Sequence, residues 1–287
     1  IGNPPWNDVK PFKREFALKH PTFFGADISK YSLSTKEFEE LFNQKLQEES
    51  VIRLWRKYLE DSSALSNFIR KNYKLQYKGN TSMQKAFLEK FIGLSRDAFS
   101  ILIPSNFHTD EGAYLLRKEI MNNWEMRELI SFENRSKNWF PDLHAQFKFD
   151  MLIVSSKKTG QPFKAMFYVD DEREIEESFD YPVPLIEELS PNVLGITEFR
   201  SQKDIEIVRK IRGNHTLLKE WGIRLSREFD ETNDKNLLST EAANDTLVVY
   251  EGRMIHQFNA KYSANRFFMS EKKARQALMP AQVKLII

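Results

Sequence analysis

Four stretches of the sequence decide the fold class that we expect: FSILIP at residues 99–104, GAYLLRKEIMNNW at 112–124, LISF at 129–132 and FDMLIV at 149–154. The first is a short apolar run that ends at a proline, which favours a buried strand with parallel neighbours. The second carries apolar residues at helical spacing, and the last two are again strand-like. A strand, a helix and a strand joined by short links predict a right-handed parallel crossover. The last two strands can also pair in antiparallel fashion across the loop between them, so we expect an α/β fold.

Upstream of this core the pattern is helical. Apolar residues three and four apart predict one helix over residues 35–49 and a second over 51–73, and Ser82 is placed to cap a third. Residues 7–35 contain Pro, Gly and Ser breaks without a sustained period, and we expect an irregular loop there. The segment at about residues 30–80 therefore has the pattern of a helical insertion.

Downstream of Lys157 the pattern is weaker. We expect a strand at residues 163–169 and a helix at 202–212, whereas the final 60 residues show only short apolar pieces, at 247–250 and 267–268, among polar ones. These pieces are separated by an acidic, proline-containing stretch and by polar segments.

Charge is distributed unevenly, although the formal net charge is only +2. Seven basic residues against two acidic ones lie within residues 53–78, and seven against one lie within 253–287. Residues 170–188 instead hold nine acidic residues and a single arginine. Basic segments of this kind can follow a polyanion such as nucleic acid, although a solvated helix face explains many of them.

The composition excludes several classes of protein. The 287 residues are 41% hydrophobic and 29% charged, which is typical of globular chains with one large domain or two ordinary ones. The absence of cysteine excludes disulfides, thiol nucleophiles and iron–sulfur clusters. The five histidines include no i, i+4 pair, and we predict no metal site. No apolar run approaches the roughly 18 residues of a membrane span, so we expect a cytoplasmic protein without membrane contact.

The motif with the clearest chemical rationale is Asn3-Pro4-Pro5-Trp6. An exocyclic amino group on a planar base is a poor nucleophile because its lone pair is delocalised into the ring. The Asn3 side-chain oxygen and the Pro4 carbonyl can each accept one N–H hydrogen, which frees that lone pair to attack a methyl group. The prolines fix φ and hold this carbonyl in place. The Trp6 ring can stack on a base that has left the duplex, so the motif indicates methylation of an amino group by alignment.

The alternative interpretation of this motif is an ordinary Pro-Pro turn after a strand. Ile1 immediately precedes the motif and has the character of the last residue of a buried strand, although no strand comes before it. We therefore expect that the chain is a fragment that begins inside a longer domain.

In the order of its motifs the chain resembles a gamma-class DNA adenine-specific methyltransferase of the combined, type IIG-like restriction-modification enzymes, from the C-terminal part of the catalytic domain onward. That family has NPP and an aromatic residue after its fourth strand, then a helix, a strand ending in proline, a helix with a Leu-Arg pair, and two closing strands. The sequence supplies these pieces in order, at residues 86–90, 101–104, 116–117 and near 129 and 152. The resemblance is good over about residues 1–156 and moderate over 245–260.

The resemblance implies a fold and a division of the chain. Residues 1–160 would form the second half of a Rossmann-like class I methyltransferase sheet with the helical insertion. Residues 161–200 would be an acidic connector, and residues 201–287 would begin a mixed α+β target-recognition region. The cosubstrate would be S-adenosylmethionine and the partner double-stranded DNA, with a restriction or specificity module as a further possibility in the same polypeptide.

The resemblance also implies roles for single residues. Phe140 matches a family segment whose Phe stacks on the flipped adenine, although a loop aromatic that plugs the sheet edge is the alternative. The segment 250–258 resembles a signature near the start of the recognition region, so Arg253, His256 and Lys261 are candidate DNA contacts. For His256 a structural role is the alternative.

Three further residues follow the strand that ends at Pro104. By the resemblance, Ser105, Asn106 and Phe107 would lie at the rim of the pocket.

The chain departs from the family pattern in its cofactor motif. The family has a glycine-rich turn after its first strand, and here Gly93 and Gly222 are isolated. We therefore expect the cofactor-binding residues upstream of Ile1, and a chain that alone neither binds S-adenosylmethionine with full affinity nor transfers methyl groups. Glu271-Lys272-Lys273 has the E-x-K spacing of a nuclease but lacks a Pro-Asp partner, so we predict a solvated charge cluster and no cleavage.

Two other functions remain open at this point. The same N-P-P-aromatic turn serves methylation of glutamine side chains in proteins and of guanine in ribosomal RNA. A non-catalytic DNA-binding or assembly piece is the third reading, and it would show DNA affinity that falls steeply with salt and no methyl transfer.

Overall fold

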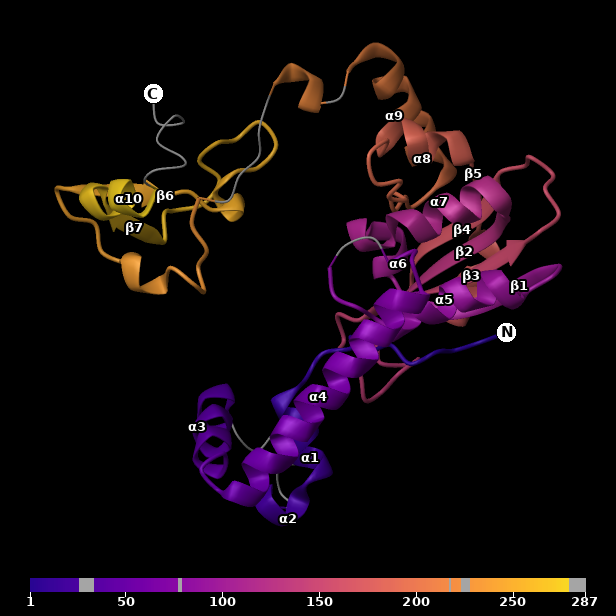
Figure 1. The fold of residues 1–287 in the computed structure, drawn as a ribbon. Coiled ribbons are helices and arrows are strands. Elements are labelled where there is room, and N and C mark those ends of the chain that lie inside the picture. The colour runs from indigo at the N-terminus through magenta and orange to yellow at the C-terminus, as the bar shows by residue number, and fades with distance from the viewer. Residues whose placement is uncertain (26–33, 77–78, 217, 223–227, 279–287) are drawn as a thin grey trace. The chain divides into compact units, whose positions relative to one another are not determined.

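The structure is a computed structural model that describes residues 1–25, 34–76, 79–216, 218–222 and 228–278. The chain divides into two compact units, Ile1–Gly213 and Asn214–Ile287 (Figure 1). The resemblance implied a division into residues 1–160, 161–200 and 201–287. The roles that it implied for these three segments stay predictions.

The first unit is built on a five-stranded mixed sheet with the order β1-β3-β2-β4-β5. Its strands are β1 (Ala98–Pro104), β2 (Glu125–Glu133), β3 (Lys148–Ser155), β4 (Phe163–Val169) and β5 (Phe179–Tyr181). Strand β3 is antiparallel to both β1 and β2, β2 is parallel to β4, and β4 is antiparallel to β5. The predicted antiparallel pairing across the polar loop is therefore confirmed.

The neighbours of β1 differ from the prediction. Because β3 lies between β1 and β2 and opposes both, these two strands run parallel without touching. The only parallel partner of β1 among the described residues is Gly2, at an isolated bridge to Ile101. The apolar run in β1 reflects burial of both faces of the sheet, which local pattern cannot distinguish from parallel pairing.

Helices and a loop cover the two faces of the sheet. One face packs against α5 (Met83–Leu94), α7 (Tyr114–Asn123) and α8 (Val183–Leu189), with Leu88, Leu116 and Leu185 among its buried residues. Between β1 and α7 lie the short α6 (Asn106–Thr109) and η1 (Glu111–Ala113), and η2 (Glu172–Glu177) and α9 (Gln202–Asn214) follow later in the chain. The opposite face carries Ile130, Phe132, Phe149 and Val169, and aromatic side chains pack against these.

The helical insertion forms a core of its own. It contains α1 (Lys13–Lys19), α2 (Pro21–Phe24), α3 (Thr35–Lys45) and α4 (Glu49–Asn72), and α4 leads from this group to α5 in Figure 1. The helices predicted over 35–49 and 51–73 are confirmed as α3 and α4. The irregular loop predicted over 7–35 is wrong for residues 13–24, and residues 26–33 lie outside the described ranges.

The reason for this difference is tertiary. Phe16 and Phe24 are buried in the same cluster as Phe38 and Phe42, so contacts with α3 stabilise helices that are too short to be stable alone. Ser82 does precede α5, as predicted, but its side chain makes no capping hydrogen bond.

The second unit holds a two-stranded antiparallel sheet of β6 (Thr246–Val249) and β7 (Phe267–Ser270), which the two short apolar pieces of this region form. Its other elements are η3 (Leu218–Trp221), η4 (Lys235–Leu237), η5 (Gly252–Met254) and α10 (Glu271–Leu278). Across both units, none of the described helices combines the length and the apolar character that a bilayer span needs.

Candidate functional site

The segment Asn3–Trp6 begins where the chain leaves the edge of the sheet. Gly2 donates its N–H to the Ser100 carbonyl at 2.9 Å and accepts from the Leu102 N–H at 2.9 Å. A Cβ atom at Gly2 would lie 2.3 Å from the ring of Phe91, so only glycine allows this approach to β1. Gly2 thus forms a single parallel bridge to Ile101, whereas Ile1, which we expected to end a buried strand, is fully exposed.

Trp6 is anchored to the sheet by its polar and aromatic parts. Its indole Nε1–H donates to the Leu102 carbonyl at 3.3 Å. Its ring is nearly parallel to that of Phe147, with centroids 5.7 Å apart, and lies 5.7 Å from Phe149. Phe140 meets it edge-on at 5.2 Å. The ring that was predicted to stack on a base is therefore half-buried among protein aromatics.

An open pocket joins the two segments that the sequence singled out. It is lined by Asn3, Pro4, Pro5 and Trp6 on one side, and by residues 140–143 on the other. Its volume is about 610 Å³, within the range of roughly 300–1,000 Å³ typical of small-molecule sites. The structure thus brings Phe140 to the motif across the intervening chain.

Two hydrogen-bond acceptors at this pocket have no donor. Asn3 is exposed and Pro4 is buried. Within the ranges that the structure describes, no donor reaches the Asn3 side-chain oxygen or the Pro4 carbonyl oxygen. Polar groups in a folded protein are normally paired with protein or water. This pair of adjacent acceptors is therefore available to a ligand that carries two N–H donors.

Asn134 fixes the backbone of Phe140. Its side-chain amide donates to the Phe140 carbonyl at 2.8 Å and accepts from the Phe140 N–H at 3.0 Å. Asn134 is fully buried, and its own N–H donates to the Phe147 carbonyl at 3.1 Å. It thus closes the neck of the loop between β2 and β3. Sequence reasoning missed this residue, since one Asn in a polar loop gives no signal of which backbone it will bind.

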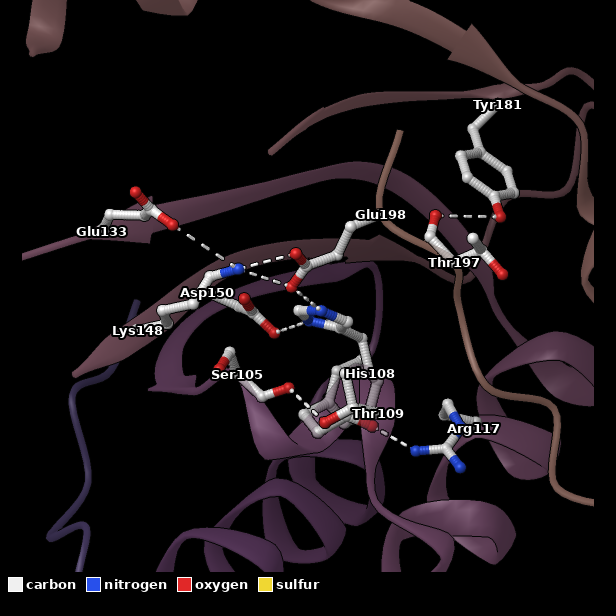
Figure 2. A network of polar contacts seen from close by, with 11 residues as sticks. Ser105, His108, Thr109, Arg117, Glu133, Lys148, Asp150, Tyr181, Thr197 and Glu198 are labelled. Atoms are coloured by element: carbon white, nitrogen blue, oxygen red, sulfur yellow. Dashed lines mark hydrogen bonds and ion pairs between the residues drawn. The ribbon is translucent and has the colours of Figure 1, made fainter. Parts of the chain in front are cut away.

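The other face of β3 carries a buried charge network (Figure 2). His108 from α6 is completely buried between two carboxylates. Its Nδ1 lies 2.7 Å from Asp150 Oδ2, and its Nε2 lies 3.0 Å from Glu198 Oε1. Lys148 donates to both oxygens of Glu198, at 2.7 and 2.6 Å. These four residues, His108, Lys148, Asp150 and Glu198, are called the charge network below.

The network shifts the protonation of its members. Burial alone would lower the pKa of His108, but the charges and hydrogen bonds of Asp150 and Glu198 raise it to about 9. The hydrogen bond from His108, with the help of Lys148, lowers the pKa of Glu198 to about 2. At neutral pH the ring is an imidazolium that donates to both carboxylates, and the network holds charges of both signs in balance.

The other predicted site residues lie away from this pocket. Phe107 is buried in the core on the helix-covered face, and Ser105 donates its N–H to the Lys148 carbonyl at 3.1 Å. Asn106 also does not line the pocket. Ser105, Asn106 and Phe107 were predicted to lie at the rim of the pocket, and none of them lines it. The chain turns into α6 directly after Pro104, which carries them away from the pocket.

The candidate DNA contacts belong to the second unit. Lys261 is exposed, and the ring of His256 stacks on that of Tyr262 at 4.7 Å. The Arg253 guanidinium pairs with Glu251 at 3.4 Å and donates to the Ala264 carbonyl at 3.3 Å. Arg253 and His256 thus support the local loop in addition to any contact with a partner.

The described residues offer little that fits a methyl donor. Around Asn3 the chain provides prolines, aromatic rings, Leu143 and one carboxylate, Asp142, and no glycine-rich turn lies beside it in the described part. No three histidine or carboxylate side chains in the described ranges are arranged to hold a metal ion. The pocket therefore offers a ligand apolar surface together with a few hydrogen-bonding groups.

Comparison with known proteins adds a weak structural similarity. No family model matches the sequence, and no curated protein matches it. Among solved structures, the type IIG restriction endonuclease BpuSI resembles the chain with 12% sequence identity and a TM-score of 0.27. The match covers 48% of this chain and 14% of that one, so it spans a small part of the length of that enzyme.

Proposed function

We propose that the chain is part of an S-adenosylmethionine-dependent methyltransferase that modifies the exocyclic 6-amino group of adenine in double-stranded DNA, within a restriction-modification system. One observation carries this proposal. Two acceptors without donors, the Asn3 side-chain oxygen and the Pro4 carbonyl, lie at a pocket whose opposite side is Phe140. The order of sequence motifs supports the same reaction.

The chemistry follows from what an adenine amino group presents. Its two N–H hydrogens would be donated to Asn3 and Pro4, which draws the nitrogen toward tetrahedral geometry and leaves its lone pair free. S-adenosylmethionine, when bound, would supply an electrophilic methyl group. The amino nitrogen would bond to that methyl carbon as its bond to sulfur breaks, which leaves S-adenosylhomocysteine, and one amino hydrogen would be lost to solvent as a proton. Because the amino group is aligned by fixed acceptors, no side chain with a shifted pKa is needed at the pocket. We therefore assign no role in methyl transfer to the charge network on the other face of β3.

The two aromatic residues have different roles in this proposal. Phe140 lines the pocket and would stack on the base after it leaves the duplex. Trp6, whose indole N–H is bound to Leu102, would hold the wall of the pocket in place. The sequence suggested that Trp6 itself stacks on the base. In this proposal Trp6 instead supports the pocket wall.

Binding of an extrahelical base tests the site without the methyl donor. A duplex carries the fluorescent adenine analogue 2-aminopurine at a mismatch, where leaving the stack costs least. We expect a fluorescence change on binding that Asn3→Ala and Phe140→Ala abolish, while overall DNA affinity is retained. Asn7→Ala, at an exposed neighbouring position, is the matched control. An identical response in wild type and Asn3→Ala would remove the role assigned to Asn3.

Transfer of a tritiated methyl group identifies the class of acceptor. The longest available parent protein that contains this sequence, and its Asn3→Ala variant, are incubated with labelled S-adenosylmethionine and, in parallel, with duplex DNA, ribosomal RNA and protein. Label in DNA that needs Asn3 supports the proposal. Label in RNA or protein but not in DNA would assign the same pocket to another substrate.

A further inference from the structure

The second unit presents a short, closed loop with a tight turn at its tip. At the base of the loop, Tyr262 donates its N–H to the Met254 carbonyl at 2.9 Å, and Met254 is buried. At the tip, His256 and Asn259 exchange backbone hydrogen bonds of 2.8 and 2.9 Å. The stacked rings of His256 and Tyr262 join the tip to the base. The loop is therefore held in one conformation by its own contacts.

Phe258 lies inside that turn and is fully exposed, at 100% of its accessible surface. Its backbone φ is 60°, in the left-handed region that bulky residues rarely adopt. This backbone conformation is sterically unfavourable for Phe. Because the ring is exposed, burial does not compensate for that cost. Strained positions of this kind occur where a surrounding structure holds a side chain for a function.

One basic side chain lies three positions after the ring in the sequence. Residues 252–278 contain six basic residues and one acidic residue, but Arg253 and Arg266 pair with Glu251 and Arg275 pairs with Glu271. The Lys261 ammonium group is exposed and makes no ion pair with any residue in the described ranges. The neighbours of Phe258 in the turn, Gln257 and Asn259, are polar and exposed. The tip thus offers one planar ring among polar groups, which suits a stack of planar bases.

We propose that Phe258 inserts into the base stack of duplex DNA as an apolar wedge, and that Lys261 beside it contacts the phosphate backbone. This inference rests on the proposed DNA substrate. Aromatic and aliphatic side chains used in this way partly unstack a base step, and the exposed base faces then gain contact with the ring. Because every base has such a face, the contact strengthens binding without reading sequence.

Substitution of Phe258 separates stacking from the shape of the loop. Asn tolerates a positive φ better than Phe does, so Phe258→Asn should leave the melting temperature of the chain unchanged or higher. We expect it to weaken duplex binding by roughly five- to a hundredfold, the range found for loss of one aromatic–base contact. Phe258→Trp keeps a stacking ring and should bind like wild type. Leu247→Ala, which trims another exposed apolar residue of this unit, is the control.

Salt dependence separates the wedge from the phosphate contact. Affinity is measured by fluorescence anisotropy with the full chain and a 30-base-pair duplex over a series of salt concentrations. Phe258→Asn should lower affinity equally at all of them, since stacking releases no counterions. Lys261→Ala should instead reduce the slope of log affinity against log salt by about one. A thymine beside the inserted ring should also become reactive to permanganate with wild type and not with Phe258→Asn.

The outcomes distinguish this inference from the function on which it rests. If wild type binds duplex DNA and Phe258→Asn binds equally well, the wedge is wrong and the proposed function stands. If Phe258→Asn changes the salt slope instead, Phe258 positions phosphate contacts and the wedge is again wrong. If wild type has no affinity for duplex DNA at low salt, the proposed DNA substrate fails and the wedge fails with it.

Discussion

Strand β3 carries two very different surfaces on its two faces. Phe149 points to the face where Trp6 and Phe140 pack, beside the open pocket. The next residue, Asp150, points to the opposite face and receives His108. Successive side chains of a strand alternate between faces, so two adjacent positions in the sequence serve an exposed aromatic site and a buried ionic one.

The contrast shows which polar groups are available to a ligand. In the charge network each side chain has an ionic partner within the protein, although Asp150 Oδ1 receives no donor, and the shifted pKa values of His108 and Glu198 follow from those partners. At the pocket, the Asn3 side-chain oxygen and the Pro4 carbonyl oxygen receive no donor from the described residues. Perturbed ionisation often indicates a catalytic site, although structural ion networks produce it too. Here the acceptors without partners are the better indicator.

The largest expected effect is on the buried face. Asp150→Ala would leave the His108 imidazolium with Glu198 alone in a buried place, and breaking such a pair typically costs about 3–5 kcal/mol in the free energy of unfolding. Urea denaturation followed by circular dichroism measures this loss. Asp171→Ala removes a half-exposed aspartate paired with Arg173 at the surface and should cost far less. Equal losses in the two variants would mean that the network does not stabilise the fold.

The pH dependence of stability is a second test of whether the charge network stabilises the fold. His108 has a folded pKa of about 9 against an ordinary 6.5, so its contribution is complete below about pH 6.5 and is lost as pH rises through 9. Glu198 has a folded pKa of about 2 against an ordinary 4.5, so its contribution is complete above pH 4.5 and is lost as pH falls toward 2. We expect unfolding free energy to decline between pH 6.5 and 9, and this decline to be absent in His108→Gln.

On the pocket face we expect a smaller loss of stability together with a loss of base binding. Asn134→Ala removes both hydrogen bonds to the Phe140 backbone, which should cost about 1–3 kcal/mol. Because Phe140 would no longer be held at the pocket, the 2-aminopurine response should be lost as well. Asn138→Ala, an exposed position in the same loop, should leave both quantities unchanged. A normal response in Asn134→Ala would separate base binding from the position of Phe140.

Local pattern was sufficient for several elements. The apolar runs at 99–103 and 149–154 became β1 and β3, and helical spacing located α4 and α9 to within a few residues. It failed for α1 and α2, because these depend on Phe16 and Phe24 contacting α3. For the candidate site, the sequence singled out Asn3–Trp6 and Phe140, which line one pocket. Their catalytic and stacking roles stay predictions.

The sequence by itself thus determined the four longer strands of the sheet, the helices α3, α4, α5, α7 and α9, and the two adjacent acceptors at Asn3 and Pro4, because burial period and proline geometry act over a few neighbouring residues. Only the tertiary structure decided that β3 enters between β1 and β2, that Asn134 holds Phe140 beside Asn3, and that His108 meets Glu198 across 90 positions of chain. These arrangements depend on long-range strand pairing and on hydrogen bonds between distant segments, and no local period encodes either.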